Sequence, residues 1–353
     1  MGDTRTGRAG GQRRARAFIG SFTSAGGPGV LAAAWDADSG ALHVTGASDG
    51  VADPSFLALD GDVLYAVSET EQGAVAAFDV TGPAPRPLGA PVPVGASGPT
   101  HLAVVGGHVL TANYTSGSVS ALPRGAGGTL GAPTGRLHHE GSGPVAERQA
   151  GPHAHQVLPD PGGRWVLAVD LGTDSVTISA LDPATGALRP HGAAALRPGT
   201  GPRHLAFHPA GTHAYVLNEL EPTLTVCRWD PENGVLTPLG ETPVVPDGTT
   251  GPAYPSEVVA APDGRFLWAA VRGTDTLAVL ALDHGGDTAR LVATVPCGGR
   301  WPRDLALAPS GRHLYAANER SGDVTWFTVD PEQGVPERAG SVPAPAASCV
   351  VFG

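Results

Sequence analysis

Short apolar runs alternate with turns rich in glycine, proline and aspartate along nearly the whole chain, from Ala17 to the C-terminus. No window keeps the apolar period of an amphipathic helix over helical length. Runs such as VLYAVSE, HLYAANE and TLAVLALD are instead bounded by turn residues, which is typical of β-strands. The pattern predicts an all-β protein built from short strands.

A corner made of a proline, one or two polar residues and an apolar tail recurs along the sequence. The corner prolines stand at positions 54, 99, 152, 202, 255 and 302, so successive corners are 45, 53, 50, 53 and 47 residues apart. In most units a glycine-containing turn and three further apolar runs follow the corner in constant order. A repeat of this length with four strands is typical of a propeller blade.

Six such units extend from Pro54 to about Pro345, and one apolar run, Ser348–Phe352, is left over. The N-terminal runs AFIGSF, GVLAAAWD and ALHVTGAS supply three more strands. We predict a seven-bladed β-propeller whose last blade combines N- and C-terminal strands, with Ser348–Phe352 innermost. Such closure removes the open sheet edges that promote aggregation.

The domain organisation follows from the same pattern. We expect residues 17–353 to form a single β-propeller domain. Residues 1–16 are rich in arginine and glycine and lack the apolar stretch of a signal peptide or a membrane span, so we expect a disordered tail there.

Composition narrows the class of partner. The chain is 41% hydrophobic and carries a formal charge of -11, which argues against a nucleic-acid or anionic membrane surface and favours a small-molecule partner. Cys227, Cys297 and Cys349 are odd in number and scattered, so they suggest neither a disulfide framework nor a zinc site. We expect a cytoplasmic monomer.

The repeat also predicts where polar residues meet. If each corner strand is innermost and starts at one mouth of the channel, the second strand returns to that mouth. The polar residues fall at these two places, and the expected substrate contacts are His101, His153, Asp170, His204, Glu257, Arg303 and Asn318. Arginine holds carboxylate or phosphate groups and imidazole moves protons near neutral pH, so we expect a small anionic substrate.

The segments GPHAHQV, GPRHLAFHP, LNEL, APDGRFLWAAVRGTDTLAVL and PRDLALAPSGRHLYAANERSGDV occur in order at blade spacing. From about Phe18 to Phe352 the chain resembles the lactonase family of seven-bladed propellers, which includes 6-phosphogluconolactonases of the cycloisomerase type and carboxy-muconate cyclases. The resemblance implies an enzyme that opens or closes the lactone of an anionic sugar acid or related carboxylate, without a metal or organic cofactor. It also implies catalytic roles for the residues at the matching positions, which are His155, Arg203, Glu219 and Arg272.

Our mechanistic hypothesis is that His155 or Glu219 activates a water and the other orients it or returns the proton. Arg203 and Arg272 then stabilise the substrate anion and the developing oxyanion. A carboxylate beside two guanidinium groups stays ionised, so His155 is the better candidate for delivering the proton.

Several alternatives stay open. His153 and His155 lie on one face of a strand and could ligate a metal, but no third ligand has a suitable spacing and the surroundings are rich in arginine. The arginines could form inter-blade salt bridges, and His155 could be structural. The function could be muconate-type cyclisation or partner binding by a non-enzymatic propeller, although a mouth with few aromatic anchors favours an enzyme. Residues 138–140 (His-His-Glu) are expected in a solvated loop, with a role at the rim of the mouth as the alternative.

Overall fold

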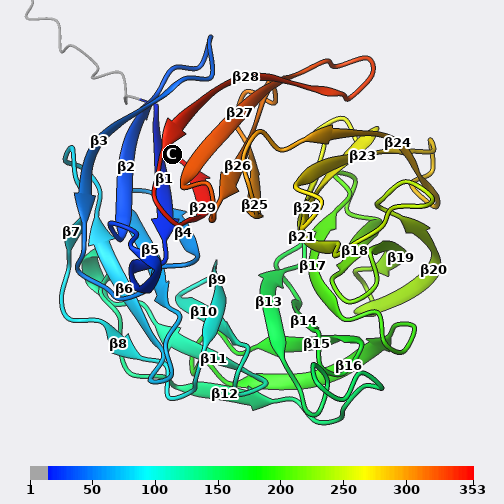
Figure 1. Cartoon of the computed structure of the whole chain (residues 1–353). Helices are drawn as coiled ribbons and strands as arrows, with labels where there is room; N and C mark the ends of the chain where they lie inside the picture. Colours follow the sequence, from blue (N-terminus) through cyan, green and yellow to red (C-terminus); the bar gives the residue numbers. More distant parts are fainter. Residues whose placement is uncertain (1–14) are drawn as a thin grey trace, which may run out of the picture.

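The computed structural model describes residues 15–353. Within this range the chain forms seven antiparallel sheets around a central axis, each one blade of a propeller (Figure 1). Six sheets have four strands, and in the remaining one two short strands, β7 and β8, share the outermost position on β6. The predicted seven-bladed all-β propeller is confirmed.

Blades 1 to 3 follow one another in the sequence. Their strands are β4 (Leu57–Asp60), β5 (Val63–Ser68), β6 (Ala74–Asp79), β7 (Arg86–Pro87) and β8 (Val92–Pro93) in blade 1; β9 (Pro99–Val105), β10 (His108–Asn113), β11 (Ser118–Pro123) and β12 (Gly135–His138) in blade 2; and β13 (Ala154–Pro159), β14 (Val166–Asp170), β15 (Ser175–Leu181) and β16 (Leu188–Ala195) in blade 3.

Blades 4 to 6 repeat this order. Their strands are β17 (Pro202–Phe207), β18 (His213–Asn218), β19 (Thr223–Asp230) and β20 (Val235–Pro243) in blade 4; β21 (Tyr254–Ala260), β22 (Phe266–Arg272), β23 (Thr276–Leu282) and β24 (Ala289–Pro296) in blade 5; and β25 (Pro302–Leu307), β26 (His313–Asn318), β27 (Asp323–Val329) and β28 (Pro336–Pro343) in blade 6. Short 3-10 helices occur at η1 (Thr23–Ala25) and η2 (Ala126–Gly128).

Blade 7 joins the two ends of the chain. Its strands lie in the order β29 (Ala347–Phe352), β1 (Arg16–Ser21), β2 (Val30–Trp35) and β3 (Leu42–Ser48), so the C-terminal strand is innermost as predicted. Phe352 pairs with Ala17, and the C-terminus lies beside β1 in Figure 1. β1 begins at Arg16, one residue inside the expected tail, and residues 1–14 of that tail lie outside the described residues.

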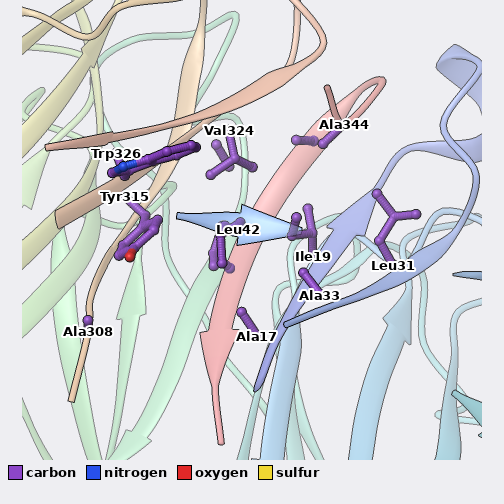
Figure 2. Close-up of a cluster of buried hydrophobic side chains, with 13 residues drawn as sticks. Ala17, Ile19, Leu31, Ala33, Leu42, Ala308, Tyr315, Val324, Trp326 and Ala344 are labelled. Carbon is purple, nitrogen blue, oxygen red and sulfur yellow. The ribbon is translucent and has the colours of Figure 1, made fainter. Parts of the chain in front are cut away.

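The hydrophobic core lies between neighbouring blades. The cluster in Figure 2 combines Ile19 and Leu31 of blade 7 with Tyr315 and Trp326 of blade 6. Middle strands are covered on both faces in this way, and every residue of β26 is buried. This two-sided burial explains why the second strands read as continuous apolar runs rather than as alternating patterns.

Hydrogen bonds from second-strand aromatic side chains link consecutive blades. The hydroxyl of Tyr215 donates to Gly286 O, and that of Tyr315 donates to Gly40 O, each in the outer turn of the following blade. The indole of Trp268 donates to Gly334 O in the same arrangement. These bonds set the angle between blades and hence the geometry of the channel.

Candidate active site

A β-bulge near the start of the inner strands turns polar residues into the channel. In β17, Pro202 lies opposite Asn218 and His204 opposite Leu217, so Arg203 has no partner in the ladder. The register shifts in the same way around Thr100, His155, Arg303 and Ser348. A bulge re-aims side chains, and these extra residues line the cleft at the channel mouth.

The bulges correct one part of the predicted repeat. Ala154, rather than Pro152, occupies the place that Pro202 has in blade 4, because Ala154 pairs with Asp170 as Pro202 pairs with Asn218. His155 is therefore the equivalent of Arg203. The second histidine of the pair, His153, precedes β13 and lies outside the channel-facing positions.

A cleft opens at this mouth. It draws residues from all seven inner strands or the corners before them. Its lining consists of Phe22, Ser55, Phe56, Glu69, Thr100, His155, Arg203, His204, Glu257, Arg303, Asp304 and Ser348.

Glu219 ties three arginines together beside the cleft. Its Oε2 lies 2.7 Å from Nη2 of Arg272 and 3.2 Å from Nε of Arg203, and its Oε1 accepts a hydrogen bond of 2.7 Å from Nη2 of Arg148. Burial alone would raise the pKa of Glu219, but Arg272, Arg203 and Arg148 lower it to about 2. The carboxylate is ionised and is a poor proton acceptor at neutral pH.

This cluster carries an excess of positive charge. Three guanidinium groups share one carboxylate among the described residues, which leaves two positive charges without a counter-ion. Neither Glu69 nor Glu257 forms an ion pair with these three arginines, and burial raises the pKa values of both carboxyls. Burial and repulsion from Arg272 lower the pKa of Arg203 to about 9. Buried charge of this kind is stabilised by a bound anion.

Three buried imidazoles, those of His101, His155 and His204, lie beside the arginines. The ring of His204 is 5.1 Å from that of His155 and 5.3 Å from that of His101, centroid to centroid. Burial, followed by repulsion from Arg203 or a neighbouring histidine, lowers all three pKa values well below the ordinary range. The rings are therefore neutral, and an anion bound beside Arg203 would offset the repulsion that lowers the pKa of His155 and so make its ring a better proton acceptor.

Glu257 and Asp304 form a carboxyl pair on the other side of His204. Oε2 of Glu257 lies 2.5 Å from Nδ1 of His204, and the carboxyls of Glu257 and Asp304 influence each other's protonation. Burial raises the pKa of Glu257 to about 7, and burial together with the charge of Glu257 raises that of Asp304 well above its usual range.

Aromatic rings at the mouth stack on its polar groups. Trp301 adopts a left-handed backbone with φ 63°, and the guanidinium groups of Arg320 and Arg272 lie 3.4 and 5.6 Å from the centre of its ring. Arg303 lies over the ring of Phe22 and forms an ion pair with Glu319. The expectation that the mouth has few aromatic residues was therefore incomplete, but these rings hold charged side chains in place.

Three expected substrate contacts lie away from the cleft. Asp170 is fully buried, and its carboxylate accepts bonds from the backbone of His153 and Gly172 and contacts the ring of His139. His153 stacks on Tyr114. Asn318 is fully buried and donates to Thr325 within blade 6. None of the three lines the cleft, and the polar atoms named here are bonded within the fold, although Oδ1 of Asn318 is buried without a partner among the described residues.

The loop between β12 and β13 contributes a site residue that the sequence prediction missed. Arg148 reaches Glu219 from this loop and also bonds to the hydroxyl of Tyr114 at 3.3 Å. Gln149 anchors the loop, because its buried amide donates to Leu171 O and to Asp174. The loop is also not wholly solvated as expected, since the side chain of His139 is 2% exposed. The sequence did offer one sign of this role, because Arg148 lies shortly before the strand that carries His155.

The described residues contain no group of three or more histidine, cysteine, aspartate or glutamate side chains arranged to hold a metal ion. Within residues 15–353 we also find no helix of sufficient length and apolarity to span a membrane.

The fold is a seven-bladed propeller whose channel mouth gathers arginine, histidine and carboxyl side chains. The family model described as lactonase, 7-bladed beta-propeller, matches residues 16–352, and the chain belongs to this family.

Among curated relatives, 6-phosphogluconolactonase of Bacillus subtilis (strain 168) is 32% identical over 95% of this chain and 97% of its own length. The crystal structure of a putative 6-phosphogluconolactonase from Bacteroides fragilis superposes with a TM-score of 0.90 at 27% identity, covering 98% of this chain and all of the other. The Pseudomonas aeruginosa periplasmic gluconolactonase gives a TM-score of 0.87 at 27% identity over 96% of this chain and 98% of its own.

Proposed function

We propose that this chain hydrolyses the lactone of a phosphorylated sugar acid, as a 6-phosphogluconolactonase does. The observation that carries the proposal is the cluster of Arg148, Arg203 and Arg272 around Glu219, with two uncompensated positive charges beside a cleft. A phosphate monoester carries nearly two negative charges at neutral pH and so matches this excess. The name of the Bacillus relative supports the same substrate class.

The roles follow from charge and exposure. Arg203 and Arg272 orient the anion and stabilise the oxyanion that forms when water attacks the lactone carbonyl. His155 lines the cleft with a neutral ring and accepts the proton of that water. Glu219 holds the arginines in position. Its pKa of about 2 argues against the alternative in which Glu219 is the base.

The remaining expected contacts act around this centre. His204 lies between contacts to His155 and His101, Glu257 contacts His204, and Arg303 faces the cleft from blade 6. The proposal includes no metal or organic cofactor. We also propose that the protein is a monomer in the cytoplasm. Cys227, Cys297 and Cys349 are buried, free thiols in the structure, and a reducing cytoplasm keeps thiols free.

The test compares two lactones that differ only in the phosphate group. We expect the purified chain to open 6-phosphoglucono-δ-lactone faster than the spontaneous reaction, with kcat/KM roughly tenfold to hundredfold above that for glucono-δ-lactone. Rates should be unchanged after exhaustive chelation. A wild-type protein that accelerates neither reaction would contradict the proposed function, and equal kcat/KM values would contradict the phosphate assignment.

A further inference from the structure

Lactone opening moves two protons, one from the attacking water and one to the ring oxygen as it leaves as an alkoxide. In the proposed function His155 takes the first proton. Glu219 does not hold a proton for the second step, because it is ionised and shared by three arginines. The second step therefore needs another group in the cleft that holds a proton at neutral pH.

His204 has the geometry of such a group. Its Nδ1 lies 2.5 Å from Oε2 of Glu257, while its Nε2 is buried and has no hydrogen-bond partner among residues 15–353. The side chain lines the cleft together with His155. A buried ring nitrogen without a partner costs free energy, and a substrate atom in the cleft would supply the missing partner.

The groups behind His204 fix its partner in place. Oε1 of Glu257 accepts a bond of 3.0 Å from Val258 N, and the charge of Glu257 raises the pKa of the neighbouring Asp304. Asp304 in turn accepts a bond of 2.8 Å from Val350 N in the C-terminal strand. An imidazole oriented by a carboxyl group that is itself held by the backbone is the arrangement that proton-transfer sites use.

We propose that His204 is a second catalytic residue, which donates the proton from Nε2 to the leaving ring oxygen, and that Glu257 positions it and replaces that proton through Nδ1. The inference rests on the proposed lactonase function and adds to it a source for the second proton.

The step balances as follows. His155 accepts a proton from water while the water oxygen bonds to the lactone carbonyl carbon. The bond between that carbon and the ring oxygen then breaks, and the ring oxygen takes the Nε2 proton of His204 as the Glu257 proton moves to Nδ1. The products are a hydroxy acid, a protonated His155 and an ionised Glu257. Solvent then protonates Nε2 of His204 as its Nδ1 proton returns to Glu257, His155 releases its proton to solvent, and the hydroxy acid loses its own proton.

The protonation states agree with this geometry. Burial raises the pKa of Glu257 to about 7, so its carboxyl is partly protonated at neutral pH. Burial and repulsion from Arg203 and Arg272 keep the pKa of His204 well below its usual range, so the imidazole is neutral. The other ionisable groups around the pair are His101, His155, Asp304 and, beyond Arg203, Glu219.

The experiment measures kcat for 6-phosphoglucono-δ-lactone between pH 5.5 and 8.5 in the wild type and in Glu257→Gln. We expect the wild-type kcat to fall above about pH 7 as Glu257 loses its proton. Glu257→Gln keeps a hydrogen-bonding side chain but no transferable proton, so kcat should drop roughly 100-fold to 10,000-fold and lose this alkaline decline. The matched control is Asp287→Asn, which alters the pair between His213 and Asp287 away from the channel and should keep the wild-type profile.

Thermal unfolding of each variant separates a folding defect from a catalytic one. If Glu257→Gln does not fold, His204→Gln replaces it and should show the same loss of the alkaline decline. A folded variant with the wild-type kcat, or with a reduced kcat but the same alkaline decline, would overturn the role of the pair while leaving the lactonase function intact. Absence of turnover by the wild type would overturn the proposed function and, with it, this inference.

Discussion

Glu219 and its three arginines are the residues on which the substrate assignment depends. Nη2 of Arg272 reaches Glu219 while its Nε donates to Tyr254 O at 3.1 Å, so the planar group is fixed at both ends. Lysine keeps the charge but cannot make two fixed contacts from one planar group.

We expect Arg272→Lys and Arg203→Lys to raise KM for the phosphorylated lactone roughly tenfold or more, with a smaller effect on the neutral lactone. Only the phosphorylated lactone carries an anionic group that the planar guanidinium can bind through two N–H groups at once. Steady-state kinetics on both lactones would check this. Arg197→Lys is the control, since Arg197 forms an exposed ion pair with Glu221 outside the channel. Equal losses on both substrates would indicate a structural role for the two arginines.

The protonation of Glu257 has a consequence for stability that does not depend on activity. Its pKa rises from 4.5 to about 7 on folding, so its contribution is fully present below pH 4.5 and is lost as pH rises through 7. Relative to Glu257→Gln, the wild type should lose about 3 kcal/mol of unfolding free energy between pH 4.5 and 7. Urea unfolding at several pH values would measure it, and a difference that is constant with pH would contradict the assigned protonation.

At the scale of the element, blade-to-blade hydrogen bonds hold the channel in shape. The hydroxyl of Tyr315 donates to Gly40 O at 2.6 Å and accepts from the indole of Trp35 at 2.9 Å, whereas that of Tyr215 makes one such bond, to Gly286 O at 3.2 Å. Removing a buried hydroxyl leaves its partners unpaired, and the cost grows with their number.

We expect Tyr315→Phe to lower the free energy of unfolding by about 2 to 3 kcal/mol and Tyr215→Phe by about 1 kcal/mol. Urea denaturation of both variants would test the order. Equal, negligible changes would show that these bonds do not hold neighbouring blades together.

The sequence allowed the strands and the blades to be predicted because their signals are local. Apolar runs such as HLYAAN mark buried middle strands, and turns follow them at constant spacing. The bulges were not predictable, because a bulge depends on the pairing between two strands rather than on either strand alone. The resulting error is visible at Pro152, which resembles the other corner prolines in sequence but lies two residues before the structural equivalent, Ala154.

Part of the candidate site could be predicted because the repeat also fixes the positions of the strands that carry it. His155, Arg203 and Arg272 lie on strands whose position the repeat fixes, and the fold brings them to the same mouth as Glu219. Arg148 comes from a loop whose path no periodicity fixes. The structure places Asp170 and Asn318 outside the cleft lining, because their burial and internal hydrogen bonds depend on the tertiary structure, which the repeat pattern does not give.

At the scale of the whole molecule, the C-terminal strand both closes the ring and supports the site. β29 pairs with β1, its Val350 packs in the cluster of Figure 2, and the same residue donates to Asp304. Loss of this strand would expose an edge of β1 and open the channel.

Deleting residues 346–353 should therefore abolish cooperative unfolding or lower the melting temperature by far more than deleting residues 2–14, which precede the described part of the chain. Circular dichroism during heating would compare the two truncated proteins. Similar melting temperatures would mean that the ring does not depend on closure by β29.

The central claim is that this channel mouth is a lactonase site in which His155 transfers a proton. The most direct measurement is the kcat of His155→Ala for 6-phosphoglucono-δ-lactone, compared with the wild type and with His43→Ala, whose exposed ring lies on β3 away from the channel. The account predicts a decrease of roughly 100-fold to 10,000-fold for His155→Ala alone, with an unchanged melting temperature. A folded His155→Ala protein that turns over the lactone at the wild-type rate would contradict it.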